Sequence, residues 1–100
     1  MATINTRTEG DVLTITVEGR FDFSVHKLIR GAYRDSDGHK TRYVVDLAKA
    51  DYMDSSALGM LLLLREHAAN RAGAVMLRNC RPEICNILRI ANFDKLFSVG

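Results

Sequence analysis

Apolar and polar residues alternate near the start of the chain. Within residues 12–18, Leu13, Ile15 and Val17 are separated by polar residues, which is the period of a strand with one buried face. Residues 4–8 have the composition of a short edge strand, and the glycine at position 10 predicts a hairpin between the two strands. We expect the chain to leave the sheet at residues 19–22.

The spacing of apolar residues then changes to three and four, the period of an amphipathic helix. Ser24 is a candidate N-cap for a helix that ends near Arg34. The turn-forming residues 35–38 end this helix. Its expected buried stripe consists of Val25, Leu28, Ile29 and Ala32.

Two further strands flank a helix rich in leucine. Residues 42–47 and 74–77 are expected strands, and the apolar centre of the first suits a strand covered on both faces. The helix after Asp54 is apolar almost all round, so we expect it to be largely buried. Pro82 fits the first turn of a last helix. Residues 93–97 supply large side chains that complete the core.

This order of elements predicts an α/β chain of the mixed, α+β kind. We expect a central mixed β-sheet of about four to five strands with helices packed on it. The strands at residues 42–47 and 74–77 should be parallel, because a helix connects them. A chain of 100 residues fits one domain over residues 1–100.

Composition narrows the classes of function. The formal net charge of +2 is too small to indicate direct binding of nucleic acid. The apolar run at residues 60–64 is far shorter than the roughly 20 residues that span a bilayer, and residues 1–10 lack the hydrophobic stretch of a leader. We therefore expect a cytoplasmic protein without membrane insertion, in which Cys80 and Cys85 are reduced structural thiols.

No pattern of catalytic or cofactor-binding residues accompanies these elements. A serine nucleophile needs a nearby base, and His26, His39 and His67 fall at unrelated points, the last at a surface or helix end. The histidines share no metal-ligand spacing with the cysteines, and no glycine-rich loop with lysine marks a nucleotide site. We expect no enzyme activity, no cofactor and no metal.

The junction between the strand at residues 42–47 and the leucine-rich helix carries two hydroxyl groups. If Ser55 is the N-cap, its oxygen is occupied by a backbone N–H, whereas Ser56 points outward as the better phosphoacceptor. A phosphate adds about −1.5 to −2 charges, which the positive helix end accommodates and Asp51, Asp54 and Asp22 oppose. A partner that loses about 4 kcal/mol in this way binds roughly a thousandfold more weakly.

Two small residues follow these serines. Ala57 and Gly59 would let the backbone of a partner approach closely, which favours a contact surface. In the alternative interpretation, Asp54 and Ser55 only start the helix, and Gly59 gives room for core packing.

The segment Asp54-Ser55-Ser56-Ala57-Leu58-Gly59-Met60 follows a Val-Val-Asp-Leu strand and, further back, Gly19-Arg20-Phe21-Asp22. In these motifs the chain resembles the STAS domain of bacterial anti-sigma factor antagonists, over essentially its whole length. The element D-S-S/T-x-L-G at a strand–helix junction is fairly specific, whereas G-x-F/L-D alone is weak. Ala57 departs from the glycine of many members and could reduce partner fit.

The resemblance implies a partner switch. The unmodified antagonist binds a serine kinase of the histidine-kinase-like ATPase fold, which also acts as an anti-sigma factor. Phosphorylation of the second hydroxyl residue, here Ser56, ends the interaction, and a metal-dependent serine phosphatase restores it. Asp22 and Asp54 match positions beside the phosphoserine and the partner contact.

The helix after Asp22 carries part of the docking surface in that family. This implies a docking role for Lys27, Arg30 and Arg34, for which a solvated helix face is the simpler interpretation. The alternative function is a non-switching STAS adaptor subunit that binds an ATPase or signalling enzyme.

Overall fold

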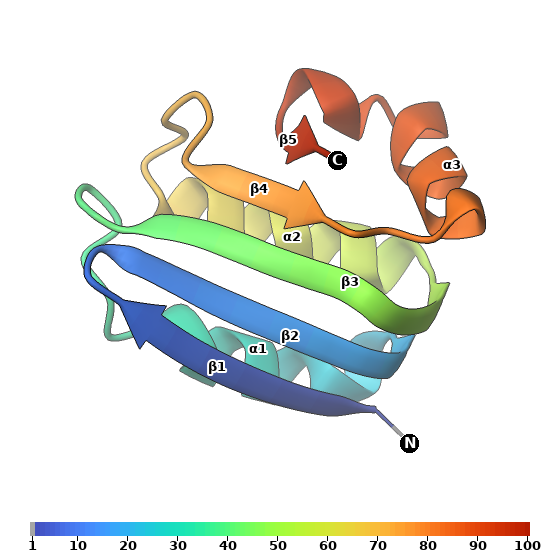
Figure 1. The fold of residues 1–100 in the computed structure, drawn as a ribbon, viewed down its shortest axis with the longest axis horizontal. Helices are drawn as coiled ribbons and strands as arrows, with labels where there is room; N and C mark the ends of the chain where they lie inside the picture. The colour runs from blue at the N-terminus through green and yellow to red at the C-terminus, as the bar shows by residue number, and fades with distance from the viewer. Residues whose placement is uncertain (1) are drawn as a thin grey trace.

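The computed structural model describes residues 2–100 (Figure 1). Its sheet contains five strands and its helical segments include three α-helices. The elements are β1 (Thr3–Glu9), β2 (Val12–Phe21), the 3-10 helix η1 (Phe23–Val25), α1 (His26–Tyr33), β3 (Arg42–Met53), α2 (Ser55–His67), β4 (Val75–Arg78), α3 (Pro82–Ile90), the 3-10 helix η2 (Phe93–Lys95) and β5 (Ser98–Val99).

The strands lie side by side in sequence order, from β1 to β5. β1 and β2 are antiparallel, and each later pair is parallel. The predicted mixed sheet is therefore confirmed. The hairpin at residues 10–11 is confirmed as well, and its Gly10 has φ +59°, a conformation that glycine adopts without strain.

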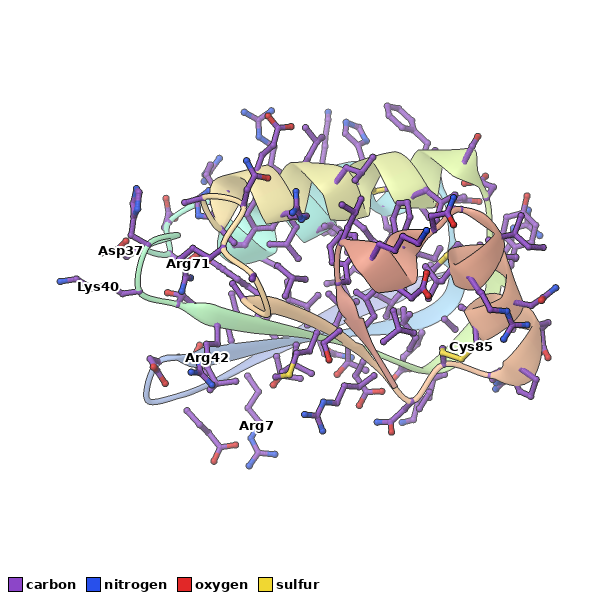
Figure 2. All side chains as sticks on the ribbon, turned by 90° about the horizontal axis from the view of Figure 1, so that it is seen from above. Arg7, Asp37, Lys40, Arg42, Arg71 and Cys85 are labelled. Atoms are coloured by element: carbon purple, nitrogen blue, oxygen red, sulfur yellow. A yellow bond between two sulfur atoms is a disulfide. The ribbon has the colours of Figure 1, made fainter. Side chains whose placement is uncertain are left out.

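Helices α1 and α2 cover one face of this sheet (Figure 1). Leu13, Ile15, Tyr43, Val45 and Leu77 point into the core between the two layers and are buried. On the other face, Arg7 and Arg42 extend away from α2 (Figure 2). The expectation that residues 42–47 are covered on both faces is therefore wrong, because α1 and α2 lie on the same side.

β2 and β3 continue further than expected. Residues 19–21 were predicted to leave the sheet but belong to β2, where Gly19 has φ +87° next to a register shift against β3. A β-bulge uses glycine in the same conformation as a turn does, which explains the wrong boundary. The extension brings the ends of β2 and β3 together, with Phe21 paired to Met53.

The leucine-rich helix is less buried than expected. Met60, Leu61 and Leu64 are buried, but Leu62 and Leu63 are 39% and 57% exposed. Leu28 on α1, predicted to be buried, is 56% exposed. Each helix contacts the sheet with one side only, and no other element of residues 2–100 covers the outer side.

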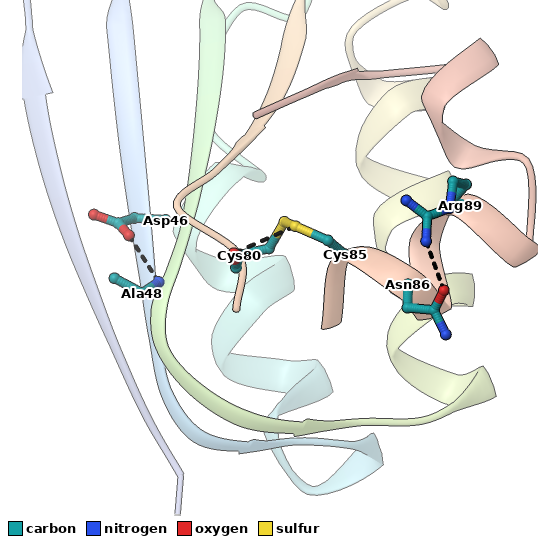
Figure 3. Close-up of a disulfide and its surroundings, with 6 residues drawn as sticks. All are labelled: Asp46, Ala48, Cys80, Cys85, Asn86 and Arg89. Carbon is teal, nitrogen blue, oxygen red and sulfur yellow. Dashed lines mark hydrogen bonds between the residues drawn. A yellow bond between two sulfur atoms is a disulfide. The ribbon is translucent and has the colours of Figure 1, made fainter. Parts of the chain in front are cut away.

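Cys80 and Cys85 form a disulfide, so the prediction of reduced thiols is wrong (Figure 3). The prediction considered the spacing of the two cysteines on a helix, where a separation of five residues puts them on different faces. Only Cys85 lies on α3, whereas Cys80 precedes the helix, and their Cα atoms are 5.4 Å apart, within the usual range for a disulfide. Beyond α3, the prediction for the tail is confirmed, since Phe93 and Phe97 are buried.

Candidate functional site

The site is formed by two aspartates at the ends of neighbouring strands. Asp22 follows Phe21 at the end of β2, and Asp54 follows Met53 at the end of β3. Because these strands are parallel and paired at their last residues, both aspartates lie at the same edge of the sheet. Ligand and partner sites of parallel sheets commonly lie beyond this carboxyl edge.

Asp54 is the N-cap of α2. One of its carboxylate oxygens accepts hydrogen bonds from the backbone N–H of Ser56 at 3.0 Å and of Ala57 at 3.2 Å. The same oxygen accepts the Ser56 hydroxyl at 2.5 Å. The predicted N-cap, Ser55, is instead the first residue of the helix and is exposed. An aspartate serves as an N-cap as well as a serine does, so residue type alone did not distinguish the two.

Asp22 repeats this arrangement on the other strand. Its carboxylate accepts the backbone N–H of Ser24 at 3.0 Å and the Ser24 hydroxyl at 2.5 Å. Asp22 therefore caps η1, and the prediction that Ser24 is the N-cap is wrong. Arg20 lies 3.5 Å from Asp22 and also covers the ring of Tyr52.

Hydrogen bonds keep both carboxyl groups ionised. The Ser56 hydroxyl is the largest influence that lowers the pKa of Asp54 below its ordinary 3.8, with help from the N–H groups of Ala57 and Ser56. Burial and the nearby charge of Asp22 oppose this effect. The pKa of Asp22 is lowered mainly by Ser24, through its hydroxyl and its N–H.

Ser56 was expected to point outward with a free hydroxyl, and this is wrong, because the residue is half-buried and Asp54 accepts its hydroxyl. A phosphate ester at this oxygen has no hydrogen left to donate, so the bond to Asp54 would be lost. The dianion would then lie beside the Asp54 carboxylate, and only the partial positive charge of the helix end would offset the repulsion.

Comparison with known proteins identifies the family. The model described as "Mlab, STAS domain" matches residues 4–98. The chain belongs to the STAS domain family. A STAS-domain containing protein of Pseudomonas aeruginosa (strain UCBPP-PA14) is 52% identical over 92 residues, which cover 92% of this chain and 91% of the relative.

Solved structures share the fold at low sequence identity. A putative anti-sigma factor antagonist from Thermotoga maritima has a TM-score of 0.81 at 15% identity, over 96% of this chain and 84% of that one. The Bacillus cell fate determinant SpoIIAA in its phosphorylated form has a TM-score of 0.75 at 18% identity, over 98% and 91%. The fold of this chain is thus the SpoIIAA-like STAS fold.

Ala57 and Gly59 differ in their exposure to solvent in this STAS domain. Ala57 is fully buried, so the expectation that it belongs to a contact surface is wrong. Gly59 is half-exposed, and a methyl group at its Cα would meet no atom within 4 Å. The interpretation that Gly59 gives room for core packing is therefore also wrong, and its place on the outer side of α2 agrees with a contact role.

The basic residues of α1 lie on the side of the helix that faces away from the sheet. Lys27 and Arg30 are exposed on α1, and Arg34 is exposed directly after it. They extend from near the Asp22 end of the helix to its opposite end.

Sequence reasoning missed a polar network at that opposite end. The Nε2 atom of His67 lies 2.9 Å from the carbonyl oxygen of Ser36 and 3.3 Å from the Ser36 hydroxyl, which also lies 2.5 Å from the Tyr43 hydroxyl. No sequence pattern connects residues 31 positions apart. A carbonyl only accepts, so Nε2 carries the hydrogen and cannot serve Ser36 as a base.

Among residues 2–100, no group of three or more His, Cys, Asp or Glu residues could hold a metal ion. Within the same residues, no helix combines the length and the apolar character needed to cross a membrane.

Proposed function

We propose that this STAS domain is an anti-sigma factor antagonist controlled by phosphorylation of Ser56. Its unphosphorylated form binds a serine kinase of the histidine-kinase-like ATPase fold that is also the anti-sigma factor. Phosphorylation releases that partner, and a metal-dependent serine phosphatase restores binding.

The hydrogen bond between the Ser56 hydroxyl and the Asp54 carboxylate carries this proposal. It fixes the oxygen at the start of α2, at the carboxyl edge of the sheet, before a kinase arrives. A hydroxyl that donates to a carboxylate has more electron density on its oxygen, which suits attack on a phosphorus atom. The exposed Ser55 has no hydrogen bond from its hydroxyl among the described residues.

The cap also explains how the domain would remain folded in both states. Phosphorylation removes the hydroxyl bond, but the N–H groups of Ser56 and Ala57 can still bond to Asp54. Release of the partner would then follow from the added charge, since a docked protein would have to desolvate a dianion. Asp22, Ser24, Ser55 and Gly59 would surround that charge in the interface.

The fold of the structural relatives supports the same function. The Thermotoga maritima protein is described as a putative anti-sigma factor antagonist, and SpoIIAA has been solved in phosphorylated and unphosphorylated forms. These relatives are at most 20% identical to this chain, so they support the proposal through the fold alone.

Phosphate mapping tests the acceptor. The purified domain is incubated with ATP and a serine kinase of the histidine-kinase-like ATPase fold from the same organism, and the modified residue is located by tandem mass spectrometry. We expect phosphate on Ser56, unchanged uptake by Ser55→Ala and none by Ser56→Ala. Uptake at Ser55 alone, or at no residue, would refute the assignment.

Partner affinity tests the switch. Calorimetric titration with the kinase should show tight binding of Ser56→Ala and binding of Ser56→Glu that is weaker by about a thousandfold, the equivalent of about 4 kcal/mol. Ser98→Glu, at an exposed serine on the edge strand β5, is the matched control for added charge and should leave the affinity unchanged. Equal affinity of wild type and Ser56→Glu would favour a non-switching adaptor that binds an ATPase or signalling enzyme.

A further inference from the structure

A groove lies between α1 and α2, at their ends remote from Ser56. It has a volume of about 340 Å³ and is lined by Arg30, Tyr33, Arg34, Leu63 and His67. The arginines and the tyrosine come from α1 and its C-terminal flank, whereas the leucine and the histidine come from α2. One rim of the groove is therefore cationic and the other is apolar.

The floor of this groove is held in place by the polar network. The rings of Tyr33 and His67 are tilted against each other with their centroids 5.0 Å apart. His67 donates to the carbonyl oxygen of Ser36 at 2.9 Å, and the Ser36 hydroxyl donates to the carbonyl oxygen of Tyr33 at 2.5 Å. A surface that is ordered before binding loses little conformational entropy when a ligand docks.

The cationic rim is available for pairing. Arg30 forms no ion pair within residues 2–100, and Lys27 lies one turn before it on α1. Arg34 lies 3.6 Å from its neighbour Asp35, with both side chains more than half exposed, so this pair contributes little. Glu66 on α2 also lies near Tyr33, and burial together with the charge of Glu66 raises the pKa of that residue. Among the residues that line the groove, two are arginines and none is acidic.

The leucine side chain on the apolar rim is unusually exposed to solvent. Leu63, on the α2 side of the groove, is 57% exposed. An exposed leucine beside two exposed arginines marks a surface that both an apolar and an acidic group would cover favourably.

We propose that this groove docks an amphipathic helix of a protein partner that is acidic on its polar face. A bulky apolar side chain of the partner fills the space between Arg30 and Leu63, and its Asp or Glu residues pair with Arg30 and Arg34. Charge complementarity selects this occupant over a basic helix. A free small anion fits less well, because it would leave Leu63 exposed.

This inference goes beyond the proposed function and does not depend on phosphorylation. Leu63 follows Ser56 by seven residues, which corresponds to about 10 Å along α2. A helix lying in the groove therefore need not touch Ser56.

A peptide assay tests the proposal without kinase or ATP. The probe is a synthetic amphipathic helix of about 18 residues with a leucine stripe flanked by glutamates, and its counterpart has lysines in place of the glutamates. In fluorescence anisotropy, the glutamate peptide should bind wild type and should bind the double variant Arg30→Glu/Arg34→Glu at least about tenfold more weakly. Arg42→Glu, on the other side of the sheet (Figure 2), is the matched control and should leave binding unchanged.

Further measurements separate this inference from the phosphoacceptor. Ser56→Glu should bind the glutamate peptide as wild type does, and backbone NMR shifts on binding should gather in residues 27–34 and 62–67. Failure of Ser56 to accept phosphate would leave these results unaffected. The proposal is overturned if neither peptide binds, if the lysine peptide binds as tightly, or if Arg42→Glu or Ser56→Glu weakens binding as much as the double variant.

Discussion

Asp22 and Asp54 lie next to each other at the ends of two paired strands, and each carboxylate holds the serine two residues further along the chain. The paired residues Phe21 and Met53 directly precede them, and the charge of Asp22 opposes the hydrogen bonds that lower the pKa of Asp54. The hydrogen bonds from Ser24 and Ser56 to these carboxylates have the same length, 2.5 Å. The two helical segments thus start in the same way at one edge of the sheet.

Removal of the Asp54 carboxylate should destabilise the start of α2. Asp54→Ala deletes the acceptor of three hydrogen bonds, whereas Asp54→Asn retains an oxygen in the same place and remains a good N-cap. We expect a clear loss of unfolding free energy for alanine and a smaller loss for asparagine, measured by urea denaturation at pH 7. An alanine variant as stable as wild type would contradict the capping role.

Acid should destabilise the wild-type domain through the same carboxylates. The pKa values of Asp22 and Asp54 are lowered in the folded state, so their contribution is fully present above the unfolded pKa of about 3.9. It is lost as the pH falls through the lower folded values. Urea denaturation between pH 6 and pH 2 should show a smaller acid-induced loss for Asp22→Asn/Asp54→Asn than for wild type. Parallel profiles would contradict the prediction.

Gly59→Ala should stabilise the isolated domain. The added methyl group meets no atom within 4 Å, and alanine favours a helix over glycine by about 1 kcal/mol. If the proposed partner covers α2 at this point, the same methyl group should weaken its binding. Thermal unfolding and partner titration measure the two effects, with Gly31→Ala, which is equally open, as the control on α1.

Gly38→Ala should have the opposite effect on stability. Gly38 is buried, and a Cβ atom there would lie impossibly close to the carbonyl oxygen of His67, so the loop or the end of α2 must move. Arg71 resists that movement, since it donates to the carbonyl oxygens of Gly38 at 2.9 Å and Thr41 at 2.5 Å. We expect a loss of about 1–3 kcal/mol in urea denaturation, as for other overpacked sites. A change below about 0.5 kcal/mol would refute this.

Loss of the Cys80–Cys85 disulfide should cost at most about 2 kcal/mol, because it closes a short loop. Urea denaturation of Cys80→Ser/Cys85→Ser, or of wild type in dithiothreitol, should reveal this loss. The reductant should not affect the double variant. Wild-type stability that is the same with and without dithiothreitol would contradict the prediction.

The periodic parts of the fold could be predicted from the sequence. Leu13, Ile15 and Val17 alternate and face the core as expected, and the order of strands and helices gave the mixed sheet. These features depend on the spacing of apolar residues along the chain, which can be read directly from the sequence. Leu28 was misassigned because the pattern cannot show that the sheet has helices on one side only.

The detailed geometry of the candidate site could not be predicted. Asp54 and Ser55 are both good N-caps, and only the path of the backbone decides which one accepts the N–H groups. The contact of His67 with Ser36 joins residues far apart in the sequence, which no local pattern encodes. Cys80 and Cys85 could be paired only once the start of α3 was known.

Because both main helices follow parallel strands, they run in the same direction across the sheet. The helical layer therefore has two chemically distinct poles, one with serines and carboxylates, the other with arginines and a histidine. Two molecules could attach to this small domain simultaneously, one at each pole, without competing for the same atoms.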